Sequence, residues 1–387
     1  MRLLIAGGGT GGHIYPALAV ARSLHEHAAK ADIAWLGGHR GLEASIVPAA
    51  GLPLRRLLLR SLRTVELDQH AVLDPIRLGL SVPQAAAMLV AERPDAIFTT
   101  GGYVAVPVLL AARPLGIPAV LWDGNVIPGR AVRLTARLAS ALTVSFRATC
   151  EALGASAGGR RPCYVTGTPI RDTRQVDREA ARARMGIPGD VRVLLVFGGS
   201  QAVRRFNQAV GEALPRLVER VAVIHVTGDD GYGPALAARE ALAPEIRDRY
   251  RPHPFLRDDM LAALASADLL VGRAGSSTLA EAGAMGVPMV VVPYPHAAGH
   301  QRANARAMVD AGAALLIEDE AFDAAALLEA ATLLDDPARH VAMSSAARSL
   351  GRPGAADAVA EIVLAAAERR PWPAPEVIER RSRGGGA

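Results

Sequence analysis

The stretch LLIAGGGTGGH at residues 3–13 decides the fold of the N-terminal half. Apolar residues lead directly into a run of glycines, and a helical stretch at 14–27 follows, which is the pattern of a buried strand, a tight turn and a helix. Glycines at such a turn let the backbone approach a ligand closely, and the helix N-terminus offers free N–H groups to an anion. The stretch therefore predicts a parallel-sheet domain with a candidate diphosphate site, although such a turn can also serve packing alone.

The same alternation of apolar run and helical stretch recurs along the chain. Runs with following helical stretches lie at 96–99 and 106–113, at 119–121 and 131–139, and at 191–197 and from 203 onward, and further apolar runs lie at 221–226, 269–271 and 289–292. This alternation is typical of a parallel sheet covered by helices. Because 387 residues exceed the usual size of one hydrophobic core, we expect an α/β protein of two doubly wound, Rossmann-like domains.

A small, polar stretch at 154–162 indicates a loop between the domains. The residues after Arg369 are rich in Pro, Arg and Gly, a composition that disfavours packing. The expected parts are an N-terminal domain at 1–160, a C-terminal domain at 161–352, a C-terminal helix at 353–369 that could pack back on the N-terminal domain, and a disordered tail at 370–387.

Composition narrows the classes of function. The formal charge is +5 and comes almost wholly from arginine, because Lys30 is the sole lysine. Arginine suits phosphate and pyrophosphate, whereas nothing in the sequence indicates a nucleic-acid partner. Cys150 and Cys163 form no CxxC pair and no cluster with histidine, so neither a zinc site nor a disulfide framework is indicated, and a reducing compartment fits. No run of about 18 apolar residues indicates a membrane span, so we expect any membrane contact to be peripheral.

Three further glycine turns follow predicted strands, at 100–103, at 197–201 and at 272–281. Their distribution over two domains indicates one ligand-bearing crevice between the domains. The second strand ends in glycines at 37–38 rather than in an acidic residue, which disfavours NAD. Glu281 lies one helical turn into the predicted helix that follows Gly275. Its carboxylate could bind ribose hydroxyls, or it could simply complement the helix dipole.

In their order along the chain, these motifs resemble the MurG family of glycosyltransferases. The resemblance rests on GGTGGHIYPA at 8–17, GGYV at 101–104, GGSQ at 198–201, RAGSST at 273–278, VPYPH at 292–296 and HQRANA at 300–305. It implies a GT-B fold, with an acceptor-binding N-terminal domain and a UDP-sugar-binding C-terminal domain facing across a cleft. It further implies inverting transfer of N-acetylglucosamine from UDP-N-acetylglucosamine to the C4 hydroxyl of the muramyl sugar on undecaprenyl-pyrophosphoryl-MurNAc-pentapeptide, in peptidoglycan synthesis, without a metal or another cofactor.

Carried over by motif position, the resemblance implies a set of site residues. The donor contacts are Thr10, Gly11, Gly12, Asn125, Arg171, Ser200, Leu256, Ser276, Ser277, Thr278, Leu279, Ala280, Glu281 and Gln301, and the acceptor-side residues are Gly101, Gly102 and Tyr103. The uracil-facing backbone is that of Leu256 or Arg257, because the segment 255–260 has one residue more than the family pattern. This chain departs from that pattern in having Asp123-Gly124-Asn125 for a Glu-Gln-Asn triplet and Thr168-Pro169 for an Asn-Pro pair.

His13 is the candidate general base, because an imidazole titrates near neutral pH and follows the glycine turn directly. It could instead cap the helix or bind a phosphate, and His296 and His300 are the next candidates. Since no Asp-x-Asp motif or histidine cluster suggests a metal site, we expect glycine-turn amides and Arg171 to relieve the charge on the departing diphosphate.

Three other functions fit the same pattern, and one of them is a transferase that moves another sugar from its UDP donor to a lipid acceptor. A UDP-N-acetylglucosamine epimerase would share the architecture but require acidic groups near the sugar, and a non-catalytic nucleotide-sugar sensor would bind the donor without turnover. A lipid-linked acceptor implies a peripheral location at the cytoplasmic side of the cell membrane. Leucines and arginines at 52–63 and at 73–80 are candidates for the membrane-facing surface, although the first group also fits a core strand.

Overall fold

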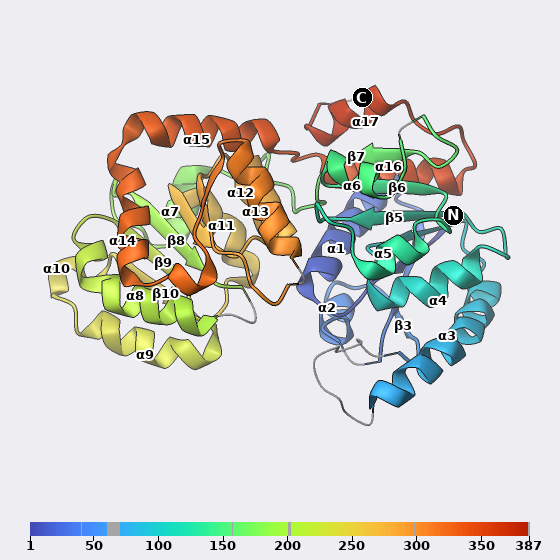
Figure 1. The fold of residues 1–387 in the computed structure, drawn as a ribbon, viewed down its shortest axis with the longest axis horizontal. Coiled ribbons are helices and arrows are strands. Elements are labelled where there is room, and N and C mark those ends of the chain that lie inside the picture. The colour runs from blue at the N-terminus through green and yellow to red at the C-terminus, as the bar shows by residue number, and fades with distance from the viewer. Residues whose placement is uncertain (40, 60–69, 157, 200–202, 298, 386–387) are drawn as a thin grey trace. The chain divides into compact units, whose positions relative to one another are not determined.

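The computed structural model describes residues 1–387 apart from 40, 60–69, 157, 200–202, 298 and 386–387. The chain divides into two compact units (Figure 1). Unit 1 comprises Met1–Arg171 and Arg352–Ala387, and unit 2 comprises Asp172–Gly351. Each unit is a parallel β-sheet with helices on its faces, as the sequence predicts.

Unit 1 is built on a parallel sheet of strand order β3-β2-β1-β4-β5-β6-β7. Its strands are β1 (Arg2–Ala6), β2 (Asp32–Gly37), β3 (Leu54–Arg56), β4 (Ala96–Thr99), β5 (Ala119–Asp123), β6 (Ala141–Val144) and β7 (Cys163–Val165). Its helices are α1 (Gly11–His27), α2 (Glu43–Ala49), α3 (His70–Glu92), α4 (Gly102–Ala112), α5 (Arg130–Thr135), α6 (Arg147–Ala152), α16 (Ala355–Ala367) and α17 (Pro375–Ser382). The order reverses between β1 and β4, so the turns after these two strands lie side by side.

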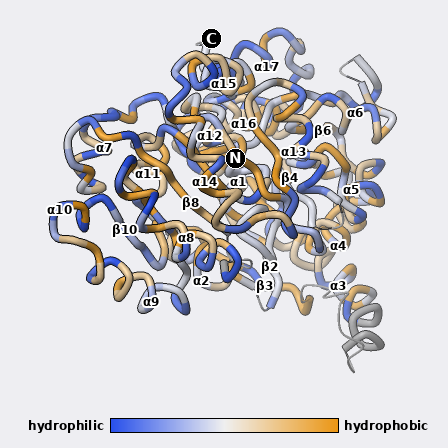
Figure 2. The backbone as a smooth tube through the Cα atoms, turned by 60° about the vertical axis from the view of Figure 1, so that its left-hand side comes forward, coloured by the Kyte–Doolittle hydropathy of each residue, from blue (hydrophilic) through white to orange (hydrophobic). Residues whose placement is uncertain are grey.

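Alternate residues of one strand enter different cores. In β1, Leu3 and Ile5 pack with α1 and α16 on one face of the sheet, whereas Leu4 and Ala6 pack with α4 on the other. Successive side chains of a strand point to opposite faces, so a strand covered on both sides is apolar throughout. The hydrophobic runs coloured orange in Figure 2, such as β4 and β8, follow this pattern, whereas α10 and α17 are largely hydrophilic.

Unit 2 repeats the architecture with strand order β10-β9-β8-β11-β12-β13. Its strands are β8 (Val193–Phe197), β9 (Ala222–Val226), β10 (Tyr250–His253), β11 (Leu269–Gly272), β12 (Met289–Val291) and β13 (Ala314–Leu316). Its α-helices are α7 (Arg178–Arg184), α8 (Val203–Val218), α9 (Gly228–Glu240), α10 (Pro244–Arg247), α11 (Met260–Ser266), α12 (Ser276–Met285), α13 (His300–Asp310), α14 (Ala324–Ala331) and α15 (Pro337–Leu350), with 3-10 turns η1 (Arg257–Asp259), η2 (Asp319–Ala321) and η3 (Thr332–Asp335). The order reverses between β8 and β11.

The boundary between the units falls after Arg171, not near residue 160 as the composition suggests. The small, polar stretch at 154–162 is a loop inside unit 1, because β7 follows it and pairs in parallel with β6. The chain then leaves unit 1 and returns to it at Arg352. On its return, α16 packs against α1 and β4.

The C-terminal tail forms helix α17, so the prediction of a disordered tail at 370–387 is wrong for most of that segment. Helix α17 is anchored by the buried Ile378 and by Arg352, whose guanidinium donates to both carboxylate oxygens of Glu379 at 2.8 and 3.0 Å. The Tyr164 hydroxyl also donates to the carbonyl of Pro373 at 2.9 Å. Local composition missed these anchors because each partner is distant in sequence.

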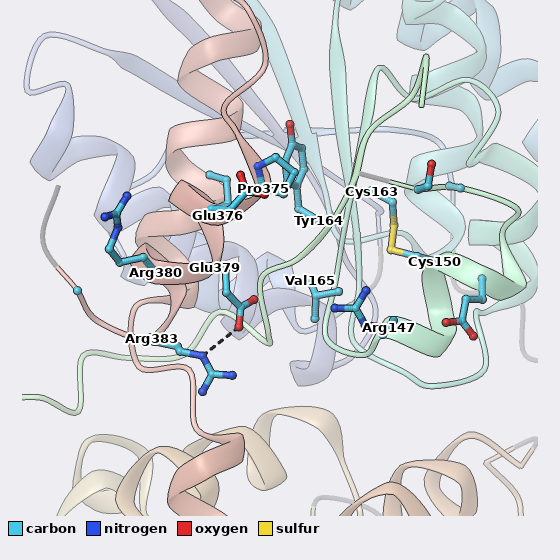
Figure 3. A pocket seen from close by; sticks show the side chains of 15 residues that line it. Arg147, Cys150, Cys163, Tyr164, Val165, Pro375, Glu376, Glu379, Arg380 and Arg383 are labelled. Carbon is cyan, nitrogen blue, oxygen red and sulfur yellow. Dashed lines mark hydrogen bonds and ion pairs between the residues drawn. A yellow bond between two sulfur atoms is a disulfide. The ribbon is translucent and has the colours of Figure 1, made fainter. Parts of the chain in front are cut away.

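Cys150 and Cys163 form a disulfide, which the sequence analysis did not expect. Cys150 lies in α6 and Cys163 begins β7, and their Cα atoms are 6.0 Å apart. The spacing of the two residues carried no signal, because adjacency arises only when β7 pairs with β6. Figure 3 shows the disulfide on one wall of a cavity of about 840 Å³, with Glu379 and Arg383 of the C-terminal segment among its other lining residues.

In the part of the chain that the structure describes, none of the helices is long and apolar enough to cross a bilayer.

We expect the disulfide to stabilise unit 1. Closing a loop of this size restricts the unfolded chain, so replacing both Cys150 and Cys163 by Ser should lower the free energy of unfolding of unit 1 by about 2–4 kcal/mol. The measurement is urea unfolding of the oxidised wild type and of the double variant, followed by circular dichroism. A thiol reductant should lower the wild-type midpoint and leave the variant unchanged. Equal midpoints for the oxidised wild type and the variant would show that the disulfide adds no stability.

Candidate active site

The first cluster of candidate residues lies in unit 1, at the carboxyl ends of β1 and β4. Gly9 adopts φ +98°, a conformation that only glycine adopts readily, and α1 begins two residues later at Gly11. Thr10 stands at the N-cap of α1 without a side-chain cap, and Gly12 is exposed. The first amides of a helix have no acceptor within the helix, so this turn can present N–H groups to an anion.

His13 is fixed to the neighbouring turn by two reciprocal hydrogen bonds. Its Nδ1 lies 2.8 Å from the carbonyl oxygen of Thr100, and the Thr100 hydroxyl donates to the carbonyl of His13 at 3.0 Å. Since a carbonyl only accepts, Nδ1 carries the proton and Nε2 keeps its lone pair in the neutral imidazole. A Cβ built on Gly102 would lie 3.7 Å from Nε2, so this nitrogen faces the start of α4.

Of the other acceptor-side candidates, Gly101 and Gly102 both have positive φ, at 79° and 71°. A Cβ on Gly101 would meet Val132 at 2.8 Å. The Tyr103 hydroxyl donates to Oε1 of Glu43 at 3.0 Å. Burial, and then the adjacent carboxylate, raise the pKa of Tyr103 above its ordinary value, so its proton stays in place. The Tyr103 hydroxyl is therefore already engaged by Glu43 within unit 1.

Asp123 organises the segment that departs from the family triplet. Its Oδ1 accepts the backbone N–H of Asn125 at 2.9 Å and the side-chain amide at 3.1 Å, and its Oδ2 accepts the N–H of Gly129, the N-cap of α5, at 3.0 Å. Burial raises the pKa of Asp123, and these hydrogen bonds oppose the rise. Asp123 therefore orients Asn125 and the start of α5. Beside β6, the Thr168 hydroxyl bonds that of Ser145 at 2.7 Å.

The second cluster lies in unit 2, after β11, where α12 begins at Ser276 behind the N-cap Gly275. Ser276, Ser277 and Thr278 occupy the first turn, and Leu279 is buried behind them. The Ser277 hydroxyl is buried and has no hydrogen-bond partner among the described residues. Ala280 and Glu281 follow and are half-buried. The turn therefore combines a helix N-terminus with small hydroxyl groups, which suits phosphate oxygens.

Arg273 ties this turn to its neighbours rather than standing free for a ligand. The buried guanidinium pairs with Asp319 at 2.5 Å, donates to the carbonyl of Val292 at 3.1 Å, and lies 4.9 Å from the centroid of the Phe206 ring and 5.4 Å from that of Tyr294. Two amides of α13 continue the network. Gln301 Oε1 accepts the N–H of Tyr294 at 2.9 Å, and buried Asn304 donates to the carbonyl of Ala274 at 3.3 Å.

The remaining sequence candidates are dispersed. Leu256 is a buried side chain at the N-cap of η1, and its carbonyl accepts the N–H of Asp259. Arg171 is half-buried at the end of the first segment of unit 1. Ser200 lies outside the described residues. The structure thus brings Thr10 to His13 together with Gly101 to Tyr103 in unit 1, where Asn125 is held by Asp123 at the end of β5. In unit 2, Ser276 to Glu281 lie in α12, and Gln301 lies in α13, which contacts α12.

Sequence reasoning missed Glu43, Thr100 as the partner of His13, and Asp319. Glu43 is fully buried and accepts hydrogen bonds from Gly9, Gly38 and Tyr103. The glycines at 37–38 and 41, which come just before this lone acidic residue, could have identified Glu43 from the sequence. Asp319 had no comparable signal, because its partner Arg273 is remote in sequence.

Two family models match the chain. The glycosyltransferase family 28 N-terminal domain matches residues 3–144, and the glycosyltransferase family 28 C-terminal domain matches residues 193–361. A relative from Desulforudis audaxviator (strain MP104C), named "UDP-N-acetylglucosamine--N-acetylmuramyl-(pentapeptide) pyrophosphoryl-undecaprenol N-acetylglucosamine transferase", is 38% identical over 371 residues. That alignment covers 94% of this chain and 98% of the relative.

Solved structures give the same picture. MurG from Acinetobacter baumannii superposes with a TM-score of 0.73 at 26% identity, covering 94% of this chain and 99% of that one. A putative UDP-N-acetylglucosamine 2-epimerase from Listeria monocytogenes superposes with a TM-score of 0.68, covering 95% and 97% of the two chains, but at 18% identity this likeness shows the fold alone. Both units thus have the Rossmann-like architecture of GT-B glycosyltransferases, and the chain belongs to glycosyltransferase family 28 and, within it, to the MurG family of N-acetylglucosamine transferases.

Proposed function

We propose that this chain transfers N-acetylglucosamine from UDP-N-acetylglucosamine to the lipid-linked muramyl-pentapeptide acceptor, undecaprenyl-pyrophosphoryl-MurNAc-pentapeptide, and so acts in peptidoglycan synthesis. Membership in a family of such transferases supports the reaction. The observation in the structure that carries it is the oriented imidazole of His13, whose Nδ1 faces the carbonyl of Thr100 and whose Nε2 stands beside a glycine turn. An oriented base is what an acceptor hydroxyl needs to become a nucleophile.

The chemistry follows from these groups. Nε2 of His13 takes the proton of the C4 hydroxyl of the muramyl sugar as that oxygen forms its bond to the anomeric carbon of the donor sugar. The bond from this carbon to the diphosphate oxygen breaks, and its electron pair leaves with UDP. Attack from the face opposite the leaving group inverts the anomeric centre. The amides and hydroxyls at the start of α12 would receive the negative charge that develops on the diphosphate.

The hydrogen bonds made by the acidic groups around His13 disfavour an epimerase. Glu43 and Asp123, the buried carboxylates of this cluster, both accept backbone amides and serve to hold turns. An epimerase would need acidic groups directed at the sugar. The use of these carboxylates supports the transferase over that alternative.

We place the membrane-facing surface on α3, α4 and α5, because a polyprenyl-linked acceptor lies at a membrane. These helices adjoin one another in unit 1 (Figure 1). Leu80 of α3 and Leu134 of α5 are 59% and 66% exposed. The exposed Arg137 follows Leu134 closely in sequence, and the exposed Arg113 is the C-cap of α4. Of the earlier candidates, Leu57 and Leu59 are buried core residues, residues 60–63 lie outside the described part, and so do the side chains of Leu73 and Ile76.

The direct test of the function is a transfer assay. Radiolabelled UDP-N-acetylglucosamine and membranes that contain the muramyl lipid should yield a labelled, butanol-soluble product, and the reaction should persist in a metal chelator. Donor binding without product on any lipid acceptor would indicate a sensor. Exchange of hydrogen at C2 of the donor sugar without acceptor would indicate an epimerase. An absolute need for added magnesium would overturn the metal-free mechanism.

Removal of the candidate base tests the mechanism. His13→Gln keeps a polar side chain but cannot accept a proton, so kcat should fall by about 10²–10⁴ while the affinity for UDP stays nearly unchanged. Steady-state kinetics and calorimetric titration with UDP give the two quantities. Near-normal turnover in a correctly folded variant would remove His13 from the mechanism.

The membrane surface is tested by replacing Leu80 and Leu134 with Ser together. Withdrawing a leucine from an apolar medium costs about 1.5–3 kcal/mol, so cosedimentation with anionic vesicles should weaken by about 10-fold or more. The KM for the long-chain acceptor should rise, and activity on a soluble short-chain analogue should remain. Val341→Ser is the control, because Val341 is equally exposed at 66% but belongs to unit 2. Unchanged vesicle binding in the double variant would place the membrane surface elsewhere.

A further inference from the structure

Glu43 is a fully buried carboxylate beside the candidate base. It is the first residue of α2 and is 0% exposed. Its Oε2 accepts the backbone N–H of Gly9 at 2.9 Å, and its Oε1 accepts the N–H of Gly38 at 2.9 Å and the Tyr103 hydroxyl at 3.0 Å. Both amides can only donate, so a carboxylate that accepts on both oxygens satisfies every group that faces it. One side chain thus bonds the turn after β1, the turn after β2 and the start of α4.

The surrounding glycines leave the space that this carboxylate occupies. A Cβ on Gly8 would lie 2.3 Å from Oε1, one on Gly41 would lie 2.0 Å from Oε2, and one on Gly37 would lie 2.8 Å from Cγ of Glu43. Real Cβ atoms do not approach other atoms this closely. Neither Gly8 nor Gly37 has a positive φ, so close approach to Glu43, rather than backbone conformation, requires glycine at these two positions.

The two segments that Glu43 joins are those that flank His13. On one side, Gly9 is bonded to Glu43, and the carbonyl of Thr10 then accepts the N–H of His13 at 3.0 Å. On the other side, Tyr103 is bonded to Glu43 and directly follows Gly102, which faces Nε2 of the imidazole. Displacement of Glu43 would therefore loosen both walls of the space beside Nε2.

We propose that Glu43 is a positioning residue for the transfer reaction: by accepting hydrogen bonds from Gly9 and Tyr103 at once, it holds the glycine turn and the start of α4 in register around His13. This inference rests on the proposed function, since it assigns Glu43 a role through the candidate base. In this role Glu43 contacts no reacting atom and acts only through the groups to which it is hydrogen-bonded.

Glu43→Gln is the sharpest test, because glutamine matches glutamate in shape but has one acceptor oxygen and one amide NH₂. If its oxygen keeps the bonds to Gly38 and Tyr103, its NH₂ faces the N–H of Gly9, and two donors oppose each other. The variant should release the glycine turn while the volume of the side chain is conserved. Amide hydrogen exchange in the peptide that contains residues 7–12 should become at least about 10-fold faster, and kcat should fall by about 10–100-fold through misplacement of the base.

A double-mutant cycle separates positioning from general damage. If Glu43 acts through His13, adding Glu43→Gln to His13→Gln should lower kcat by less than threefold further, whereas independent losses multiply. Asp268→Asn is the matched control in unit 2. Asp268 is also a buried carboxylate, and it accepts the backbone N–H of Val193 at 2.8 Å. It precedes the amino end of β11, whereas the turn before α12 follows the carboxyl end of that strand. Its variant should lose thermal stability and keep the kcat of the folded enzyme.

Tyr103→Phe provides a second variant if Glu43→Gln does not fold. It removes one donor to Glu43 and leaves the two amide bonds, so its loss of kcat should be smaller and also non-multiplicative with His13→Gln. Unchanged exchange and unchanged kcat in Glu43→Gln, or losses that multiply in the cycle, would overturn the proposal. A wild type that makes no lipid product would instead overturn the proposed function, while the exchange measurement still reports on the bond to Gly9.

Discussion

The reversal of strand order is the constraint on which both candidate clusters depend. In unit 1 the order reverses between β1 and β4, and in unit 2 between β8 and β11. At such a point the connections on either side leave in opposite directions, so the turns there are not covered by a crossover helix. The pairing of β1 with β4 brings Thr100 to His13, although 87 residues separate them in sequence. The orientation of the imidazole is therefore a product of sheet topology.

The turns at these points need support from groups that are themselves buried. In unit 1, a carboxylate supplies it: Glu43 accepts the backbone amide of Gly9 in the turn after β1, and Asp123 does the same for the segment that follows the nearby β5. In unit 2, a cation supplies it, because Arg273 donates to the carbonyl of Val292 and pairs with Asp319. Leaving such groups unpaired in the interior would cost about 1–3 kcal/mol each, so each support is also a fold requirement.

The sequence predicts much of this fold because its signals are local. The apolar runs and glycine turns around residues 3–13 and 191–199 specify strand, turn and helix within one segment, and the structure has β1, α1 and β8 there. The C-terminal tail and the disulfide were predicted wrongly for the opposite reason. Helix α17 depends on Arg352 and Ile378, and the disulfide depends on the pairing of β6 with β7. Neither is readable from composition or spacing.

The candidate site divides in the same way. His13 and the α12 turn could be predicted because their chemistry lies in adjacent residues, a glycine run followed by a titratable or hydroxyl group. The residue types did not reveal which polar groups are already engaged. Tyr103 is an acceptor-side residue by motif position, yet its hydroxyl donates to Glu43. Asp123 replaces the glutamate of the family triplet, yet its shorter side chain still holds Asn125.

The interactions that Arg273 already makes determine how unit 2 can bind a negatively charged group. Its guanidinium already pairs with the Asp319 carboxylate, which also pairs with Arg205 at 3.4 Å. Arg273 is therefore held in place by a carboxylate and is not a free cation beside the turn. The N-terminus of α12 has no acidic residue in its first turn to offset its partial positive charge. Its first amides have no acceptor within the helix and are held in place by the helix itself, and the buried hydroxyl of Ser277 beside them has no hydrogen-bond partner among the described residues. Preorganised backbone dipoles stabilise developing charge without reorganising, and this is the physical reason why the first turn of α12 is the diphosphate site in the proposed reaction.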